Sequence, residues 1–246
     1  MKEIRYFYCP DISVSNELPK EEFEHAVKVL RLQPSDTCVL TDGKGNIYDV
    51  VISTVTKKSC TFSIISQRQL LPTWQGKIHI GVAPTKNISR IEWLVEKATE
   101  IGFDSIHFLD CQFSERKNIN IERLDKVAVA AMKQSHKSVK PKLTSFIDFN
   151  DFIRKPFDGN KYIAHCYDDK DIGNTSEKQY LPYCLQSSEC KDSMVLIGPE
   201  GDFSIQEVRM ALDYGYQPVT LGPSRLRTET AALLAVTMMN MNNVII

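Results

Sequence analysis

Apolar residues in the first 70 positions come mostly in short runs separated by turn-forming residues. The runs IRYFYCP, DTCVLTDGKGNIYDVVISTV and SCTFSIISQ are typical of strands. Within the second run, the DGKGN segment predicts a hairpin turn, because glycine tolerates the positive φ angles that such turns need. One segment, LPKEEFEHAVKVLRL, instead places Phe23, Val27 and Leu30 at helical spacing, with Pro34 just beyond. The pattern predicts a small β-barrel that carries one helix.

The spacing of apolar residues along the chain changes after the turn-like segment LLPTWQGK. From there, apolar runs alternate with long amphipathic stretches, one of them at residues 122–135, which is typical of an α/β domain with a largely parallel sheet. The candidate strands are IHIGVAP, SIHFLDC, KYIAHCY, MVLIGPEG and QPVTLGPS. The change of period falls near Pro72, so we expect domains at residues 1–71 and 72–246.

Helix boundaries in the second region follow from capping signals. Ser89 and Glu92 have the spacing of a capping box at the start of one helix, and Gly102 predicts its end. Ser204 and Glu207 have the same spacing at the start of another helix. The residues just before Ser204 therefore form a loop between a strand and a helix.

That loop belongs to the stretch LIGPEGDFSIQEV, residues 196–208, and lies at the carboxyl end of its strand. In open α/β sheets, ligands bind at this edge. Gly198 and Gly201 would let the main chain approach a ligand closely, and Pro199 would restrict the loop. Taken alone, the motif is more typical of a Gly-Pro turn that binds nothing.

The next strand ends in the same way, in PVTLGPSRLRTETAALLAV. A second Gly-Pro is followed by Arg225, Arg227, Thr228 and Glu229, which lead into a helix expected near Thr230. Two strand ends with Gly-Pro loops predict a cleft. A phosphate-binding loop is disfavoured, because no Gly-Lys-Ser/Thr follows the glycines and the spacing is not G-x-G-x-x-G. Backbone hydrogen bonds to an adenine, with the acid and arginine groups left for a substrate, would suit these loops.

Composition and charge narrow the class of protein. The 246 residues are 42% hydrophobic and 25% charged, and 30 Lys and Arg balance 31 Asp and Glu, so nucleic-acid contacts must come from local basic patches. The first residues lack an apolar signal core and no long apolar run follows, which favours a cytoplasmic protein. The seven cysteines form no CxxC pair and no metal-ligand spacing, so we expect reduced thiols and no metal.

The two loop motifs, VLIGPEGDFSIQEV and LGPSRLRTETAAL, closely resemble the paired loops of the RsmE family, the bacterial 16S ribosomal RNA uridine N3-methyltransferases of the SPOUT superfamily. The resemblance extends through IEWLVEKATEIGF, FSERKN, HAVKVLRL and the DGKG turn, and so covers nearly the whole chain. It implies a PUA-like, RNA-binding β-barrel domain followed by a trefoil-knotted α/β SPOUT domain with a mostly parallel sheet. The implied cofactor is S-adenosyl-L-methionine, the implied substrate is a uridine of 16S ribosomal RNA or the small ribosomal subunit, and the implied assembly is a homodimer.

Alternatives remain open at this point. A related SPOUT enzyme could act on another RNA target, since the cofactor loops say little about the target. A non-catalytic RNA-binding protein could also keep the fold, although Arg227 and Glu229 argue against that.

Two positions depart from the family pattern. Asp202 stands where a second glycine is usual, and aspartate is among the less unfavourable residues if that position needs a positive φ angle. In LGPSRLRTE, Ser224 stands where the family commonly has a basic residue, and Arg225 follows it. Any contact that the family makes from position 224 is therefore in doubt here.

The loops supply the candidate site residues. The resemblance implies that the backbone of both loops holds the cofactor, at Leu196, Ile197, Gly198, Pro199, Gly201, Leu221, Gly222, Leu226 and Arg227. Glu200 and Glu229 are the acids available for the N3 proton, although a Glu that begins a helix is also favoured by the helix dipole alone. Arg227 could orient the uracil carbonyls or a phosphate, or could form a structural ion pair with Glu229.

Basic residues provide the candidate RNA contacts. Residues 114–142 supply Arg116, Lys117, Arg123, Lys126, Lys133, Lys137, Lys140 and Lys142, of which a minority should reach phosphates and the rest form a solvated face. The resemblance adds Arg5, His25, Lys28, Arg31 and Lys86, and also matches Lys97, Glu100 and Gln134.

Overall fold

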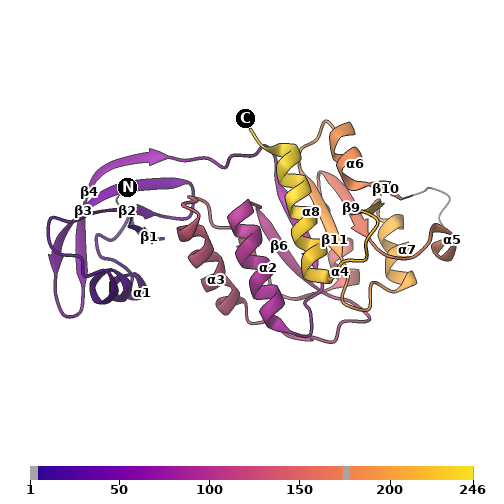
Figure 1. The fold of residues 1–246 in the computed structure, drawn as a ribbon, viewed down its shortest axis with the longest axis horizontal. Helices are drawn as coiled ribbons and strands as arrows, with labels where there is room; N and C mark the ends of the chain where they lie inside the picture. Colours follow the sequence, from indigo (N-terminus) through magenta and orange to yellow (C-terminus); the bar gives the residue numbers. More distant parts are fainter. Residues whose placement is uncertain (1–4, 174–177, 246) are drawn as a thin grey trace. The chain divides into compact units, whose positions relative to one another are not determined.

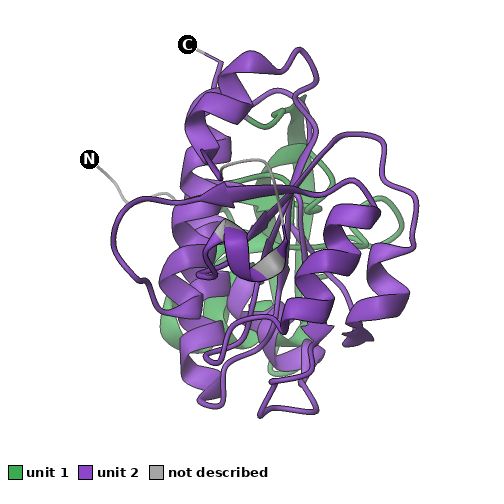
Figure 2. Ribbon diagram, turned by 90° about the vertical axis from the view of Figure 1, so that its right-hand side faces the viewer, with its two compact units in different colours: residues 1–72, 129–140 green, residues 73–128, 141–246 purple. Residues whose placement is uncertain are grey.

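A computed structural model describes residues 5–173 and 178–245. The chain forms two compact units, one of residues 1–72 and 129–140 and one of residues 73–128 and 141–246 (Figure 2). Each unit has its own hydrophobic core. The second unit holds both Gly-Pro loops.

The first unit is built on a four-stranded sheet. Its strands are β1 (Tyr6–Tyr8), β2 (Thr37–Thr41), β3 (Asn46–Val55) and β4 (Cys60–Gln69), in the order β1-β2-β3-β4. β1 pairs with β2 in parallel, and the other pairs are antiparallel. The predicted DGKGN hairpin is confirmed between β2 and β3, with φ angles of 71° at Gly43 and 102° at Gly45. The small β domain that the sequence predicts therefore forms.

The helical segment of the first unit changes its winding. It begins as α1 (Lys20–Phe23) and continues as the π-helix η1 (Glu24–Val29). Phe23 is buried as predicted, but Leu30 is 37% exposed and Leu32 is fully buried instead. The helix ends at Leu30, and Arg31 follows with a φ angle of 53°, so the chain turns back and Leu32 rather than Leu30 completes the core.

Residues 129–140 complete the first unit although they follow the start of the second in the sequence. They begin within α3 (Ile121–Gln134), which contributes to both units. Beyond α3, the Ser138 carbonyl accepts hydrogen bonds from the Gly45 N–H at 3.0 Å and from the Thr41 hydroxyl at 3.1 Å. The hairpin turn of the first unit is thus held by a distant segment.

The second unit contains a parallel sheet in the order β10-β12-β9-β11-β5-β6-β7, with β8 paired to β6. Its strands are β5 (Ile78–Val82), β6 (Ser105–Asp110), β7 (Lys142–Leu143), β8 (Ile147–Asp148), β9 (Asn160–Ala164), β10 (Gln179–Tyr180), β11 (Ser193–Ile197) and β12 (Gln217–Thr220). Every residue of β11 is buried, as expected of a central parallel strand covered on both faces. All five predicted strands are confirmed, whereas β7, β8 and β10 are two-residue strands that no periodicity could reveal.

Helices cover both faces of this sheet (Figure 1). Besides α3, they are α2 (Ile88–Ile101), α4 (Phe149–Ile153), α5 (Asp169–Ile172), α6 (Leu181–Ser187), α7 (Ile205–Asp213) and α8 (Thr228–Asn243). α2 packs against α8, and α8 packs against β5 and β11. α4 and α7 belong to a separate core cluster that includes Phe149 and Phe203. α4, α5 and α6 were not predicted, because each is too short to show a repeat.

The two capping predictions have different outcomes. The capping box of Ser204 and Glu207 is confirmed at the start of α7. The capping box at Ser89 and Glu92 is wrong, because the N-cap of α2 is Asn87, two residues earlier, whose side-chain oxygen accepts from the Ser89 N–H. Gly102 does end α2, with a φ angle of 118°.

A chain of polar side chains crosses the sheet of the second unit. His79 Nδ1 lies 2.6 Å from Ser105 Oγ, which lies 2.9 Å from His107 Nε2, and His107 Nδ1 lies 3.2 Å from Thr144 Oγ1. Burial lowers the pKa of His79 and lowers that of His107 to about 4. Both imidazoles are therefore neutral at neutral pH.

Candidate active site

The carboxyl ends of three adjacent strands meet at one edge of the parallel sheet. β9 lies between β11 and β12, and Ala164 at the end of β9 pairs with both Ile197 and Val219. The loops that leave these strands enclose a cavity of about 700 Å³. A volume of this size falls in the range of small-molecule and cofactor sites.

Most of the predicted cofactor residues line this cavity. They are Ile197, Gly198, Pro199, Leu221, Gly222, Leu226 and Arg227, together with Glu200 and with Ser224 and Arg225 at the departure from the family pattern. Two others lie elsewhere: Leu196 is fully buried in the core, and Gly201 faces the Phe113 side chain. The sequence therefore located the loops, but not which residue of each loop faces inward.

The end of β9 forms a wall of the cavity that the sequence analysis did not assign. Ala164, His165 and Cys166 line it, as does Lys178. The Lys178 ammonium group donates hydrogen bonds to the carbonyls of Tyr167 at 2.5 Å and His165 at 3.3 Å, which steadies the backbone leaving β9. KYIAHCY was recognisable as a strand, but its position beside the two loop-bearing strands depends on the strand order.

Asp202 links the GPEGD loop to the end of β9. Its φ angle is 69°, in the left-handed region that glycine adopts freely. One carboxylate oxygen accepts from the Cys166 N–H at 2.7 Å and the other from the Phe203 N–H at 2.8 Å. Burial, with a contribution from the Asp202 carboxylate, raises the pKa of the Cys166 thiol. The aspartate thus adopts a glycine-like conformation and adds a bond that glycine could not make.

Two glycines in the loops are close to irreplaceable for geometric reasons. A Cβ atom on Gly198 would lie 2.8 Å from the backbone nitrogen of Phe203, closer than atoms of a folded chain approach each other. Gly222 has a φ angle of 135° and no atom within 4 Å of the position a Cβ would take. The main chain at Gly222 is therefore open to a guest.

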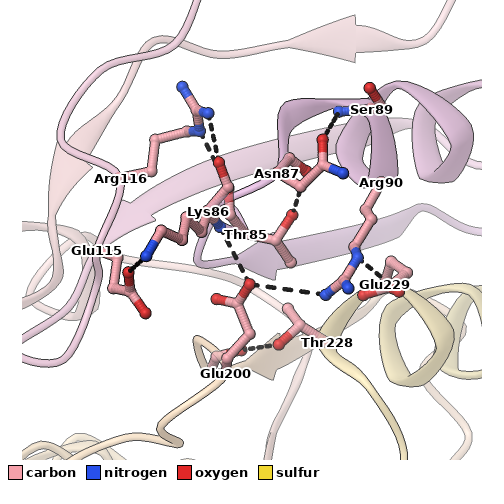
Figure 3. Close-up of polar contacts among 11 residues, drawn as sticks. Thr85, Lys86, Asn87, Ser89, Arg90, Glu115, Arg116, Glu200, Thr228 and Glu229 are labelled. Atoms are coloured by element: carbon pink, nitrogen blue, oxygen red, sulfur yellow. Dashed lines mark hydrogen bonds and ion pairs between the residues drawn. The ribbon is translucent and has the colours of Figure 1, made fainter.

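A polar network joins this cavity to the loop before α2 (Figure 3). The Glu200 carboxylate accepts from the Lys86 N–H at 3.0 Å and lies 3.8 Å from Arg90 Nη1. Arg116 donates to the carbonyls of Thr85 at 3.0 Å and Lys86 at 2.5 Å. Glu200 and Arg116 both hold the 85–86 backbone in place.

Glu229 occupies the first turn of α8 and is only 7% exposed. Its Oε1 lies 3.7 Å from Arg90 Nε, and its Oε2 has no hydrogen-bond partner among the described residues. The neighbouring Thr228 hydroxyl donates to the Gly198 carbonyl at 3.1 Å, which ties the two Gly-Pro loops together (Figure 3). The ionic partner of Glu229 is therefore Arg90, not Arg227.

Arg90 is the principal residue of this network that the sequence analysis missed. It lies in the first turn of α2, where the helix dipole disfavours a cation. The preference of a helix start for acids could therefore have drawn attention to Arg90. Its actual partners, Glu200 and Glu229, come from segments more than 100 residues away.

A second, smaller pocket of about 380 Å³ lies at the start of α2 and α8. It is lined by Ser89, Arg90, Trp93, Arg227, Glu229 and Thr230. Trp93 is 41% exposed, which is high for an indole ring. Arg227 lines both this pocket and the larger cavity, so the two spaces adjoin.

The candidate RNA-binding residues of the first unit differ in their exposure and in whether they already form an ion pair. Arg5 pairs with Asp36 at 3.3 Å and Lys28 with Glu24 at 3.1 Å, while His25 is exposed beside Phe7. Arg31 is exposed and has a φ angle of 53°.

Two other candidates of the first unit are more buried. Lys133 pairs at 2.6 Å with Glu22, which is 5% exposed. Burial lowers the pKa of Lys137, whose carbonyl accepts a hydrogen bond from the Tyr6 hydroxyl. Lys133 in particular is committed to an internal ion pair.

In the second unit, the candidate cations lie beside acids. Lys86 pairs with Glu115 at 2.7 Å and Lys117 with Asp110 at 2.8 Å, and both ammonium groups are well exposed. Hydrogen bonding to Glu115 raises the pKa of Lys86. Exposed pairs of this kind are weak and can exchange a carboxylate for a phosphate.

Within residues 5–173 and 178–245, no three His, Cys, Asp or Glu side chains are grouped so as to hold a metal ion. Over the same residues, none of the helices combines the length and apolar character needed to cross a membrane. The seven cysteines are free thiols.

Comparison with known proteins agrees with this geometry. A family model for an RNA methyltransferase domain matches residues 72–240, and one for an RNA methyltransferase PUA domain matches residues 18–65. Ribosomal RNA small subunit methyltransferase E of Buchnera aphidicola is 28% identical, over 96% of this chain and 92% of its own.

Solved structures are also similar to this chain over nearly its whole length. A probable rRNA-methyltransferase from Porphyromonas gingivalis is 40% identical, with a TM-score of 0.89 over 98% of both chains. A methyltransferase from Legionella pneumophila, solved with its bound cofactor SAM, is 27% identical, with a TM-score of 0.82 over 97% of this chain and 98% of its own. The expected fold class, a SPOUT-type α/β domain after a small PUA-like β domain, is confirmed.

Proposed function

Because the chain belongs to the RNA methyltransferase family whose members carry this PUA domain, we propose that it methylates N3 of a uridine in small-subunit ribosomal RNA. The methyl donor is S-adenosyl-L-methionine, as in the relative solved with that cofactor. The observation that carries the proposal is the 700 Å³ cavity at the ends of β9, β11 and β12, with an acid and arginine network at its rim.

The residues around the cavity suit this cofactor. Leu221, Leu226 and Val219 offer apolar contacts for an adenine ring, and the absence of a Cβ at Gly222 lets a ligand approach the backbone closely. The cavity has both polar and apolar lining, as an amino-acid nucleoside requires. When bound, the sulfonium group supplies an electrophilic methyl carbon. The chain's own task is to hold the donor and to position the acceptor base.

The three candidate catalytic residues take different roles in this proposal. Glu200 holds the loop before α2 through the Lys86 N–H, so it acts on the shape of the site. Arg227 has no ion pair among the described residues and lines both pockets, so its guanidinium is available to a uracil carbonyl or a phosphate. Glu229 presents a carboxylate oxygen without a hydrogen-bond partner among those residues. Arg227 and Glu229 are therefore the catalytic candidates.

The exposed cations of both units supply the proposed RNA contacts. Phosphate binding by Arg5, Lys28, Arg31, Lys86 and Lys117 would position the RNA without reading its sequence. The PUA domain match supports an RNA-binding role for the first unit. A ribosomal RNA substrate also implies that the proposed methylation takes place in the cytoplasm.

We further propose that the protein acts as a homodimer. The last helix, α8, carries Met241 at 71% exposure, and Val244 and Ile245 beyond it are also exposed. A run of exposed apolar side chains at one helix end is favourable when it is covered by a second subunit. Light scattering at micromolar protein should give twice the chain mass of 28.0 kDa, and a single-chain mass would exclude the dimer.

The test of function is methyl transfer to ribosomal particles. Small subunits from cells that lack the protein are incubated with isotopically labelled S-adenosyl-L-methionine, and nucleosides are then analysed by mass spectrometry. Label in N3-methyluridine is the expected result. Label in another nucleoside would move the enzyme to a different target, and no transfer to subunits or free RNA would leave an RNA-binding protein without turnover.

A further inference from the structure

We propose that the smaller pocket, lined by Ser89, Arg90, Trp93, Arg227, Glu229 and Thr230, binds the target uracil, and that Glu229 accepts its N3 proton. This inference rests on the proposed uridine methylation and adds which residues recognise the base. It also predicts that the pocket distinguishes uracil from cytosine.

The first observation is the state of the Glu229 carboxylate. Glu229 is only 7% exposed, and its Oε2 atom has no hydrogen-bond partner among the described residues. A buried acceptor without a donor is unfavourable, and native proteins rarely keep one without a reason. Glu229 also lines the pocket, so its carboxylate can accept from a donor on a ligand bound there. The N3–H group of uracil is such a donor.

The second observation is the set of charged groups that line the pocket. The Watson–Crick edge of uracil presents a carbonyl oxygen, the N3–H group and a second carbonyl oxygen. The pocket walls contain the matching set: the carboxylate of Glu229 to accept, and the guanidinium groups of Arg90 and Arg227 to donate. Cytosine has a lone pair at N3, which would face the Glu229 carboxylate and be repelled. The charges therefore favour uracil.

Both arginines have donor groups available for this role. Arg90 lies 3.7 Å from Glu229 and 3.8 Å from Glu200, distances longer than a hydrogen bond. Arg227 has no side-chain hydrogen bond or ion pair among the described residues. Figure 3 shows Arg90 extending between Glu200 and Glu229, from the start of α2. A guanidinium with five N–H groups can keep these ionic contacts and still bind a carbonyl oxygen.

The third observation is the aromatic wall. Trp93 is 41% exposed and lines the pocket, so its ring can stack on a base. A volume of about 380 Å³ accommodates a single pyrimidine nucleotide turned out of its RNA strand. Arg227 lines this pocket and the larger cavity, so a base held here lies beside the cofactor site.

The chemical step follows from this placement. The uracil N3–H bond breaks, its proton passes to the Glu229 carboxylate, and the nitrogen electron pair forms the new bond to the methyl carbon. The electrons of the broken carbon–sulfur bond stay on sulfur, which becomes a neutral thioether. A carboxylate is basic enough because the N3 proton becomes strongly acidic as nitrogen shares its electrons with the methyl carbon. Glu229 then releases the proton to water.

Tryptophan fluorescence tests base binding without turnover. The chain has two tryptophans, and Trp74 is buried at 8% exposure with its N–H bonded to Asp104 at 3.0 Å, so Trp93 should respond to a ligand. Uridine 5′-monophosphate should quench the emission, and cytidine 5′-monophosphate should need roughly tenfold higher concentration or more. Trp93→Phe should abolish the change and keep the fold.

Glu229→Gln tests the recognition of N3. The glutamine amide can turn either its carbonyl or its NH₂ group to the base, so uridine and cytidine monophosphates should bind within about twofold of each other. Methyl transfer should fall by roughly two orders of magnitude or more at saturating RNA. The matched control is Glu96→Gln on α2, whose carboxylate is bonded only to Lys97 among the described residues and lies outside the pocket. That variant should keep the preference for uridine.

The outcomes separate this subsite from the proposed function. If uridine in subunits is methylated but neither nucleotide quenches Trp93 and Glu229→Gln turns over normally, the subsite is wrong and the function stands. If the wild type shows the uridine preference but labels no uridine in subunits or free RNA, the function fails while the pyrimidine pocket remains. If Trp93→Ala dissociates the protein into single chains with unchanged nucleotide binding, Trp93 belongs to a subunit interface and the stacking role is overturned.

Discussion

Replacing Asp202 tests whether the aspartate really links the GPEGD loop to β9. Asp202→Ala removes the acceptor of the Cys166 N–H, a charge-assisted bond of 2.7 Å that contributes roughly 1.5–2 kcal/mol. It also places alanine at a φ angle of 69°, where it is less favourable than aspartate by a few tenths of a kcal/mol. The free energy of unfolding should fall by about 2 kcal/mol.

Asp202→Gly separates the two effects. It loses the same hydrogen bond but removes the backbone strain, which returns roughly 1 kcal/mol, so the net loss should be about 1 kcal/mol or less. Asp202→Asn keeps an acceptor and tolerates the positive φ angle, and should lie closest to the wild type. Urea denaturation followed by circular dichroism gives the order Asp, Asn, Gly, Ala.

Cofactor affinity should follow the same order, because Asp202 and Cys166 both line the larger cavity. Calorimetric titration with S-adenosyl-L-methionine measures it for the same four proteins. Asp202→Ala as stable as the wild type would refute the role of the hydrogen bond, and Asp202→Ala more stable than Asp202→Gly would refute the role of the backbone conformation.

Three further predictions concern other parts of the chain. Arg227→Ala should keep the cofactor Kd within a few-fold, measured by calorimetry, but lower methyl transfer by roughly two orders of magnitude; unchanged turnover would make Arg227 structural. Lys133→Met should lower the free energy of unfolding by about 3 kcal/mol in urea, because it leaves the buried Glu22 without its partner, whereas an exposed phosphate-binding lysine would have little effect. The free energy of unfolding should also fall as pH drops from 6.5 towards 4, by up to about 3 kcal/mol. The reason is that His107 becomes protonated over this range in the unfolded chain but stays neutral in the folded protein. In His107→Gln this part of the pH dependence should vanish from denaturation curves, and its persistence would assign the effect to another group.

The sequence was most informative where one short segment determines its own conformation. The DGKGN hairpin and the Ser204–Glu207 cap form as predicted, because each depends on residues that are neighbours in the chain. At Ser89 the same reasoning failed, because Asn87 is also a good N-cap and begins the helix two residues earlier. Local rules identify candidate caps but do not choose between adjacent ones.

The site itself depends on information that no single segment carries. Both Gly-Pro loops could be assigned to strand ends, but the third wall of the cavity comes from β9, which lies between β11 and β12 only once the strand order is known. The partnership of Arg90 with Glu229 likewise brings together the first turns of two helices far apart in the sequence. Residue types were therefore predictable, whereas their partners were not.

The contribution of residues 129–140 to the first unit has a consequence for synthesis. The first 72 residues cannot close their hairpin turn against Ser138 until the chain has been extended to residue 140. At about 5–20 residues per second, that wait is on the order of several seconds on the translating ribosome. Protease challenge of stalled nascent chains should find the first unit cleavable when the last exposed residue is 72 and protected when it is 140. The β domain, although first in the sequence, is completed only after the methyltransferase domain has begun to emerge.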